Sequence, residues 1–332
     1  MGQKANLSDC VNQIISLLRE RDMFVIAGHI GPDGDTIGSC LGLAMALGKL
    51  GKKAIVLLEP FAAKYRIIPG KKHLHHGAVD ALPVDVFIAL DCADVERLGF
   101  ARPLFDRAAT TICIDHHETN VGFAGYNFID PAASSTAEMV FELIDAITEV
   151  DKDIATAIYA GIVGDTGGFR FISTGKPTMD IAARLMETGI PFTDIYTEML
   201  HRHSFEAAKA FGLALGACAT AMGGRIVYTY MTREMFIQVG AESSDMDSVA
   251  EYLINTRGAD VALFLYEKHP KAEDATDKTI KVSMRSREFH VGKVAASLGG
   301  GGHRLAAGCT ITGTMDDVLL RVLEELEREL LG

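Results

Sequence analysis

A short stretch near the N-terminus carries three side chains whose types and spacing suit a metal ion. His29, Asp33 and Asp35 lie within seven residues, directly after an apolar run over residues 23–27. They offer one imidazole nitrogen and up to four carboxylate oxygens, which suits a hard or borderline divalent cation such as Mn²⁺ or Mg²⁺. Taken alone, the same residues are equally typical of a solvated turn, because Asp and Gly are common turn residues.

Acidic and imidazole side chains recur where two later apolar runs end. Residues 84–90 and residues 110–114 each have the composition of a buried strand. Candidate ligands follow these runs directly: Asp91, Asp115, His116 and His117. Asp165 follows a predicted helix over residues 151–163 and is either part of a helix-ending turn or a further carboxylate of the same cluster.

The elements around these residues predict an α/β fold. Buried parallel strands that alternate with helices form a doubly wound sheet, and the loops at its carboxyl edge gather in one place. We expect strands over residues 23–27, 53–58, 84–90 and 110–114. We expect helices over residues 7–21, 37–50, 134–147, 151–163, 178–186 and 191–221, with Ser135 and Glu138 as a capping pair.

Carboxylates gathered at one sheet edge need cations. Two carboxylates about 4 Å apart repel by about 4 kcal/mol at an effective dielectric constant near 20. Divalent ions remove this repulsion, and two ions roughly 3.5–4 Å apart hold the attacking and leaving oxygens of a phosphoryl displacement. We therefore expect two divalent ions, Mn²⁺ with Mg²⁺ as the alternative, and a water molecule between them as the nucleophile.

The pattern changes after residue 223. Strands over residues 226–231, 260–268 and 279–285, helices over residues 233–239 and 244–254, and a polar connection over residues 270–278 predict a smaller mixed α/β domain. Arg285 ends the last of these strands. Four glycines follow a helix, before His303 and Arg304 and a further apolar segment read as helical. We expect the amides of Gly300, Gly301 and Gly302 to be open to an anion, as in an anion-binding nest.

Composition limits the class of protein. The chain has 332 residues, 48% of them hydrophobic, and a formal net charge of −12, which argues against stable binding of long duplex DNA. No two of its six cysteines are spaced as a Cys-x-x-Cys pair. This favours reduced thiols in a cytoplasmic protein. No apolar run approaches the ~20 residues of a membrane span. The oligomeric state stays open, with a homodimer as one alternative.

The ordered motifs resemble one known family. The motifs around His29, Asp91, Asp115-His116-His117 and Asp165, followed by the Gly-Gly-Gly-Gly-His segment that ends at His303, are similar to those of the DHH phosphoesterases with a DHHA1 domain, most of all the nanoRNase and pAp phosphatase type. The resemblance implies a metal-binding catalytic DHH domain over residues 1–190, a helical connection over 191–223 and a substrate-binding DHHA1 domain over 224–332, with a cleft between the domains.

The resemblance also implies roles for single residues. One metal ion would be held by His29, Asp33 and Asp91, and the other by Asp35, Asp91, His116 and Asp165, so that Asp91 bridges them. Asp115 and His117 would lie behind the metal ligands or face the substrate. From their chemistry alone, we expect Asp115 to hold the His116 imidazole in one tautomer and His117 to donate to a phosphate oxygen. Substrate phosphates would lie against Arg285, Gly300, Gly301, Gly302 and His303.

The function that this resemblance implies is hydrolysis of short single-stranded RNA or DNA oligonucleotides to mononucleotides, with removal of the 3′-phosphate of pAp. Alternatives that stay open are a phosphodiesterase for cyclic or linear dinucleotides, a polyphosphatase of similar architecture, and a non-catalytic nucleotide-binding protein.

Overall fold

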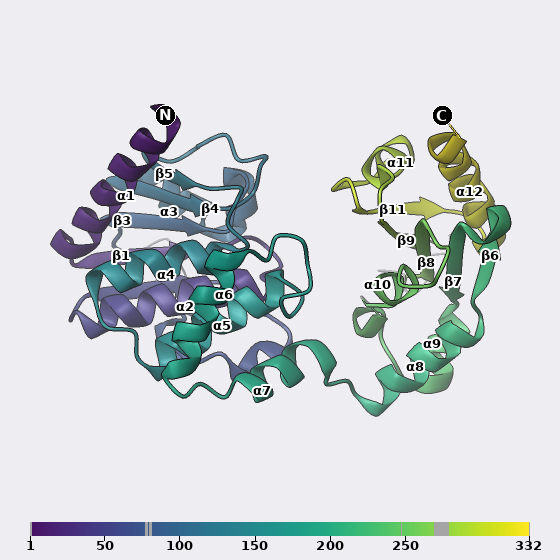
Figure 1. Cartoon of the computed structure of the whole chain (residues 1–332), viewed down its shortest axis with the longest axis horizontal. Coiled ribbons are helices and arrows are strands. Elements are labelled where there is room, and N and C mark those ends of the chain that lie inside the picture. Colours follow the sequence, from purple (N-terminus) through teal and green to yellow (C-terminus); the bar gives the residue numbers. More distant parts are fainter. Residues whose placement is uncertain (1, 77–78, 80–81, 247, 269–278, 332) are drawn as a thin grey trace. The chain divides into compact units, whose positions relative to one another are not determined.

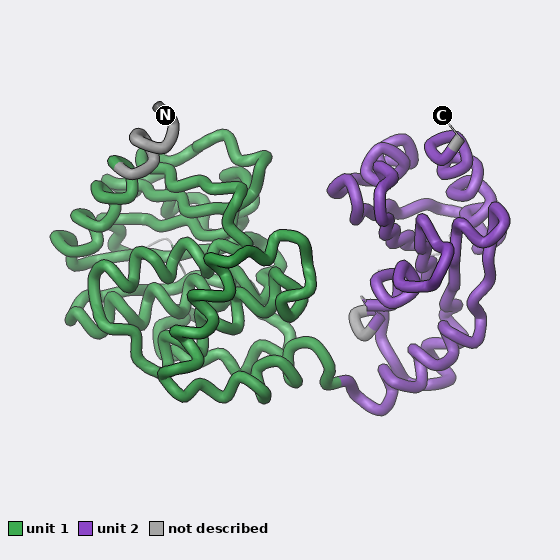
Figure 2. The backbone as a smooth tube through the Cα atoms, in the orientation of Figure 1, with its two compact units in different colours: residues 1–202 green, residues 203–332 purple. Residues whose placement is uncertain are grey.

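The chain folds into two compact units, residues 1–202 and residues 203–332 (Figure 2). The computed structural model describes residues 2–76, 79, 82–246, 248–268 and 279–331. The connection that we expected over residues 270–278 lies outside the described residues. Within these ranges, every helix is too short or too polar to cross a lipid bilayer.

A parallel sheet forms the centre of the first unit, as the sequence predicted, with five strands in place of the four expected. Its strands are ordered β2-β1-β3-β4-β5, and each pairs in parallel with its neighbours. Their bounds are β1 Met23–Ala27, β2 Lys53–Leu57, β3 Val86–Leu90, β4 Thr110–Asp115 and β5 Tyr126–Ile129. We did not expect β5, because only one of its four residues is fully buried and it therefore lacks a continuous apolar run.

Helices cover both faces of this sheet, which makes it doubly wound (Figure 1). The larger apolar core joins one face to α1 (Gly2–Glu20), α2 (Gly34–Lys49), α4 (Thr136–Ile147), α5 (Lys152–Asp165) and α6 (Lys176–Glu187). The smaller core on the other face includes residues from η3 (Val95–Ala101) and α3 (Arg102–Arg107). Two further short helical turns, η1 (Ala63–Ile67) and η2 (Lys71–His73), follow β2.

The strand order places a topological switch point between β1 and β3. The chain leaves β1 to form β2 on one side, and then returns to form β3 on the other side. Loops at the carboxyl ends of two such strands separate, and ligands bind in the crevice between them. His29 follows β1 and Asp91 follows β3, so both lie at this crevice.

Two expected helices differ from those observed. The helix expected from residue 37 begins at Gly34, because Asp33 caps its first turn. The continuous helix expected over residues 191–221 is instead α7 (Phe192–Tyr196), the π-helical turn η4 (Thr197–His201), α8 (Phe205–Gly216) and strand β6 (Ala219–Ala221). Ser204 caps α8 from its N-terminal side, so a new helix starts within the segment, and the two units divide just before it.

The second unit is a mixed sheet with helices on both faces. Its strand order is β10-β11-β9-β8-β7-β6, and only β7 and β8 pair in parallel. The remaining strands are β7 Ile226–Met231, β8 Val261–Glu267, β9 Thr279–Ser286, β10 Gly301–Gly302 and β11 Ala306–Thr312. Helices α11 (Val291–Ser297) and α12 (Met315–Leu331) cover one face, and α8, α9 (Arg233–Val239) and α10 (Val249–Leu253) cover the other.

Within the helix expected over residues 244–254, the described residues form regular α-helix only in α10, so the helix is shorter than predicted. The glycine run lies between a helix and a strand, not between two helical segments, since β11 follows it.

Candidate metal centre

The loop from β1 to α2 fixes the first pair of candidate ligands. One oxygen of Asp33, Oδ1, accepts hydrogen bonds from the amides of Asp35 at 3.0 Å and Thr36 at 3.1 Å, so this residue caps α2. Its other oxygen, Oδ2, lies 3.7 Å from Nε2 of His29. The imidazole donates from Nδ1 to the Ile30 carbonyl at 2.9 Å, which leaves Nε2 with a lone pair for a cation.

Asp35 is buried in the first turn of α2 and points at the start of another helix. Its two oxygens accept the amides of Thr136 at 2.7 Å and Ala137 at 2.8 Å, in the first turn of α4. A helix N-terminus favours a negative charge, so α4 stabilises this carboxylate. Helices α2 and α5 approach closely at Gly38, where any larger side chain would meet the Ala157 carbonyl. This close packing brings Asp35 near Asp165 at the end of α5.

Asp91 lies at the centre of the site and is only 3% exposed. Its backbone has a φ of 58°, an uncommon left-handed conformation that a short polar residue tolerates. Oδ2 accepts a hydrogen bond from the Thr36 hydroxyl at 2.6 Å and lies 3.5 Å from Nε2 of His29. Oδ1 lies 3.8 Å from Nε2 of His116 and 3.7 Å from Nδ1 of His117.

The segment after β4 contributes both imidazoles. Nε2 of His116 lies 3.1 Å from Oδ2 of Asp165, and its Nδ1 is 3.4 Å from the Ala133 carbonyl. We expected Asp115 to orient His116, and this was wrong, since its Oδ1 contacts Nδ1 of His117 at 2.7 Å. Neighbouring residues on an extended chain point in opposite directions, so Asp115 reaches the residue two positions further on.

Sequence reasoning missed the residues that hold these carboxylates. Thr36 donates its hydroxyl to Asp91, and Asn120 donates its amide to Oδ2 of Asp115 at 2.7 Å. Thr36 directly follows Asp35 in the sequence, and this position next to a candidate ligand could have identified it. Thr136 lies in a predicted helix, but its contact with Asp35 spans 101 residues that no local pattern connects.

The described residues include three groups whose ligand atoms all lie within 4.8 Å of one another. The groups are His29, Asp33 and Asp91; Asp35, His116 and Asp165; and Asp91, His116 and His117. Each contains carboxylate oxygen and imidazole nitrogen, a donor set that binds first-row divalent cations. The first two groups share no residue, and Asp91 and His116 connect them through the third. The residues therefore fit two neighbouring divalent ions.

Without such ions, the charges compensate one another by holding protons. Burial alone would lower the pKa of His29, but its contacts with Asp33 and Asp91 raise that pKa to about 10. The pKa of His116 also rises to about 10, because Asp165 and Asp35 outweigh its burial. Burial, followed by the charges of Asp91 and Asp165, raises the pKa of Asp35 well above its usual range. Divalent cations would displace these protons.

In the second unit, the strands bring two expected phosphate-binding residues together. Arg285 pairs with Ala306 across β9 and β11, which places it beside the turn that carries His303. The glycine run is more closed than the sequence suggested. The Gly300 amide donates to the Ala295 carbonyl at 2.7 Å, while Gly301 and Gly302 form β10 and pair with β11. The expectation that the Gly300 amide is open to an anion was therefore wrong.

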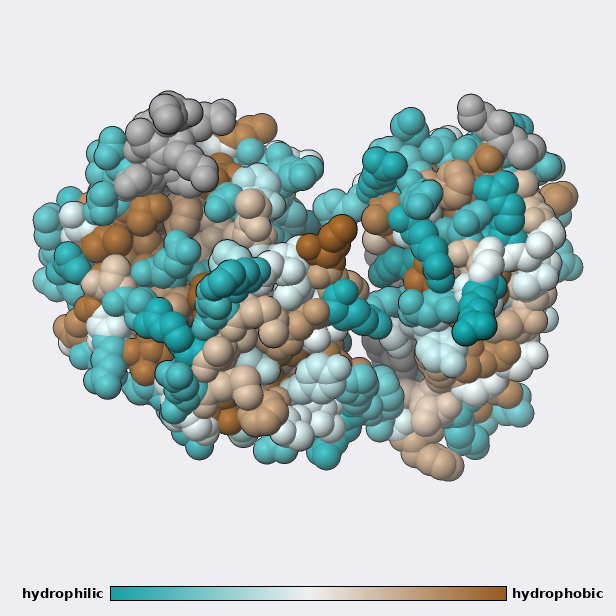
Figure 3. Space-filling view, in the orientation of Figure 1, coloured by the Kyte–Doolittle hydropathy of each residue, from teal (hydrophilic) through white to brown (hydrophobic). Residues whose placement is uncertain are grey.

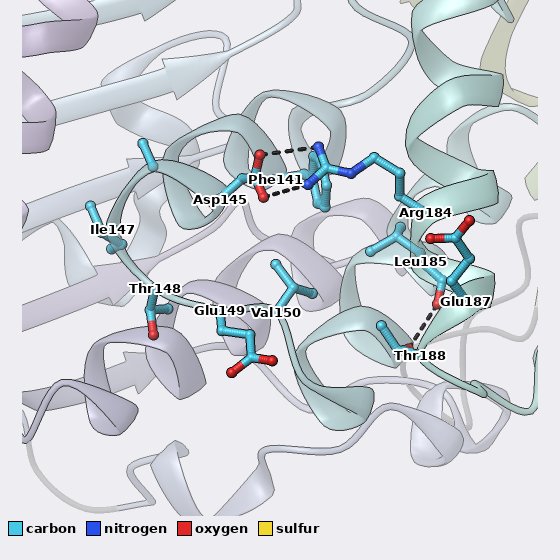
Figure 4. A pocket seen from close by; sticks show the side chains of 11 residues that line it. Phe141, Asp145, Ile147, Thr148, Glu149, Val150, Arg184, Leu185, Glu187 and Thr188 are labelled. Carbon is cyan, nitrogen blue, oxygen red and sulfur yellow. Dashed lines mark hydrogen bonds and ion pairs between the residues drawn. The ribbon is translucent and has the colours of Figure 1, made fainter.

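A pocket of about 570 Å³ lies elsewhere on the first unit, at the C-terminal ends of α4 and α6 (Figure 4). Asp145 and Arg184 form a two-bonded ion pair at 2.6 Å and 3.0 Å on its wall. Helix α4 meets the metal centre at its opposite end, at Thr136, and a helix of this length spans roughly 18 Å. This pocket is therefore separate from the metal centre.

Comparisons with known proteins match segments in both units of the chain. Residues 23–162 match the DHH family, N-terminal domain, and residues 223–331 match the DHHA1 domain. The bifunctional oligoribonuclease and PAP phosphatase NrnA of Thermus thermophilus is 35% identical over 315 residues, which cover 92% of this chain and 89% of that protein. The cyclic-di-AMP phosphodiesterase PdeA of Listeria monocytogenes is 27% identical over 86% of this chain, but only 44% of that protein is covered.

Among solved structures, an exopolyphosphatase-related protein from Bacteroides fragilis superposes with a TM-score of 0.86. The two chains are 26% identical, and the match covers 97% of this chain and 96% of that one. The match therefore spans both units of this chain.

Proposed function

The chain belongs to the DHH family of metal-dependent phosphoesterases and carries its DHHA1 domain, and from this premise we propose its cofactor and substrates. It is a Mn²⁺-dependent enzyme that hydrolyses short single-stranded oligonucleotides to mononucleotides and removes the 3′-phosphate of pAp. The observation that carries this proposal is the position of Asp91, which faces three imidazoles from two loops and connects two groups of ligands. A shared carboxylate of this kind suits a pair of ions acting on one phosphate.

In this proposal, each group of residues has its own role. His29, Asp33 and Asp91 would hold one ion, and Asp35, Asp91, His116 and Asp165 would hold the other. When bound, such ions activate a water molecule and neutralise charge on the phosphoryl oxygens. Asp115 raises the pKa of His117, which favours the protonated ring, and in this proposal that ring donates a hydrogen bond to a substrate phosphate. The backbone of α4 holds Asp35 in place, so the acidic groups stay ordered before substrate arrives.

Phosphate binding by the second unit belongs to the same proposal. Arg285 and His303 bind substrate phosphates, and Gly301 and Gly302 keep side chains away from that surface. Replacement of Arg285 by Ala is expected to raise KM for pAp about tenfold, because an Arg–phosphate contact is charge-assisted and has two hydrogen bonds. Arg328→Ala, on the exposed face of α12, is the matched control and leaves KM unchanged. An unchanged KM for Arg285→Ala contradicts this assignment.

A cyclic-dinucleotide phosphodiesterase is the second candidate, because PdeA matches this chain over both units. The test is a substrate panel with the Mn²⁺-loaded protein: pAp, RNA of two to five nucleotides, a 24-nucleotide RNA, cyclic di-AMP and inorganic polyphosphate. We expect rapid turnover of pAp and of the short RNA. Faster turnover of cyclic di-AMP or of polyphosphate contradicts the proposal, and turnover of no compound favours a binding protein.

A further inference from the structure

The loop that follows the metal centre exposes two adjacent apolar side chains. Asp165 ends α5, and Phe171 and Ile172 lie six and seven residues beyond it. Phe171 is 42% exposed and Ile172 is fully exposed. Single exposed apolar residues occur over the surface and need no explanation (Figure 3). These two differ because they are neighbours on a loop that begins at a candidate metal ligand.

This loop is held firmly against the end of α5. The Thr166 carbonyl accepts the amides of Arg170 at 2.9 Å and Phe171 at 3.0 Å, and the Thr166 hydroxyl accepts the amide of Phe169 at 2.9 Å. Phe169 adopts a left-handed φ of 67°, which is rare for a large side chain, and its ring packs on Tyr159 with centroids 5.8 Å apart. Strained residues of this kind cluster at functional sites.

The Phe171 ring is supported from two directions. It lies against Gly167, where an added Cβ would come within 2.6 Å of the ring. The guanidinium of Arg170 lies 5.2 Å from the ring centroid, within the range of a cation–π contact. The result is a fixed, partly exposed aromatic surface next to a positive charge, a short distance along the chain from Asp165.

We propose that Phe171, extended by Ile172, binds the base of the nucleotide whose phosphate lies at the metal centre. This inference deepens the proposed function, on which it rests. Stacking on an aromatic ring tolerates any base, because every base has a π face. Such a surface suits short oligonucleotides of any sequence, whereas inorganic polyphosphate offers nothing to stack. Phe171 thus favours nucleotides over other phosphate esters and polyphosphates.

The test compares a nucleotide with its base-free counterpart by binding, which needs no turnover. Calorimetry on the Mn²⁺-loaded full chain measures Kd for AMP and for ribose 5-phosphate. We expect the wild type to bind AMP about tenfold more tightly, within the range of one stacked base. Phe171→Ala reduces this preference to near parity and leaves ribose 5-phosphate binding unchanged, whereas Phe171→Tyr keeps the preference.

Two further variants distinguish the loss of a base contact from structural damage. Ile172→Ser alters a fully exposed side chain and is expected to weaken AMP binding about threefold without lowering Tm, because it removes only the edge of the stacking surface. Phe205→Ala is the matched control, since Phe205 is also exposed and has Lys209 over its ring, but it lies in the second unit, where we assign no base contact. This variant keeps the AMP preference.

Two results with the Phe171→Ala protein overturn the inference. One is a Phe171→Ala protein that keeps the AMP preference, and the other is equal weakening of AMP and ribose 5-phosphate. A wild type that binds both ligands equally overturns it as well. Hydrolysis of pAp is measured in parallel. Base-dependent binding through Phe171 without hydrolysis contradicts the proposed function and supports the base-binding surface.

Discussion

Replacement of Asp91 by Asn is the sharpest test of the metal centre. Asn also tolerates the left-handed backbone at this position, and its carbonyl oxygen can accept the Thr36 hydroxyl in place of the carboxylate. The change therefore removes a charge and keeps the shape. Ala at the same position is expected to abolish turnover too, but it adds backbone strain of about 1–2 kcal/mol.

The size of the effect follows from the position of the carboxylate. Its oxygens lie 3.5–3.8 Å from three imidazole nitrogens, so it borders the positions of both proposed ions. One unit charge acting on another at about 4 Å is worth about 4 kcal/mol at an effective dielectric constant near 20. Because about 1.4 kcal/mol is a factor of ten in rate, kcat/KM is expected to fall at least about a thousandfold.

The metal-free protein is expected to change little in stability. Asp91 attracts the protonated His29 and His116, but it also repels Asp35 and Asp165, and these effects oppose each other. Tm with chelator present is therefore expected to shift by less than about 4 °C, which corresponds to about 1 kcal/mol for a unit of this size.

The assays are kcat/KM on a two-nucleotide RNA across a Mn²⁺ titration, and calorimetry for the number of bound ions. The wild type binds two ions and the variant fewer. Asp180→Asn, which removes a carboxylate from the exposed face of α6, is the control and keeps both ions and activity. An Asp91→Asn protein with two bound ions and activity within tenfold of wild type refutes the shared-ligand geometry.

Three further predictions concern pH, orientation and packing. Because the pKa values of His29 and His116 rise to about 10 from 6.5, these two histidines stabilise the metal-free protein fully below about pH 6.5, and their contribution is lost as pH rises towards 10. Thermal melts with chelator check this, and a rising Tm over that range contradicts it. Asp115→Asn is expected to lower kcat about 10–100-fold with metal content unchanged. The reason is that Asp115 orients the His117 ring but belongs to none of the three ligand groups. Loss of bound metal in calorimetry excludes that role. Gly300→Ala is expected to destabilise the second unit by about 1–3 kcal/mol, since its Cβ would meet Cys309, whereas Gly301→Ala has open space; urea unfolding separates the two.

Most of the candidate metal ligands could be placed from the sequence because they follow recognisable apolar runs. Asp91 follows the fully buried β3, and His116 and His117 follow β4, whose apolar residues signal a buried strand. Strand ends of one parallel sheet share an edge, so the local pattern and the fold class together place these side chains near one another. The doubly wound sheet and the second mixed domain were predicted for the same reason.

Contacts between distant segments could not be predicted in the same way. The sequence does not reveal that Asp35 accepts the first amides of α4, because its partners are more than one hundred residues away. It also misassigned Asp115, whose partner depends on the direction in which the chain leaves β4. The amide of Gly300 appeared open because no sequence pattern shows that it bonds to the Ala295 carbonyl.

The sequence by itself determined the kinds of atom that this protein brings to a phosphate and the sheet edge at which they gather, because periodicity and residue type are local properties. Only the tertiary structure decided which imidazole each Asp contacts, which amides hold Asp35, and that a hydrogen-bonded loop after Asp165 leaves Phe171 partly exposed. The physical reason is that hydrogen bonds and charge pairs depend on distances of a few ångströms, and packing between helices sets these distances.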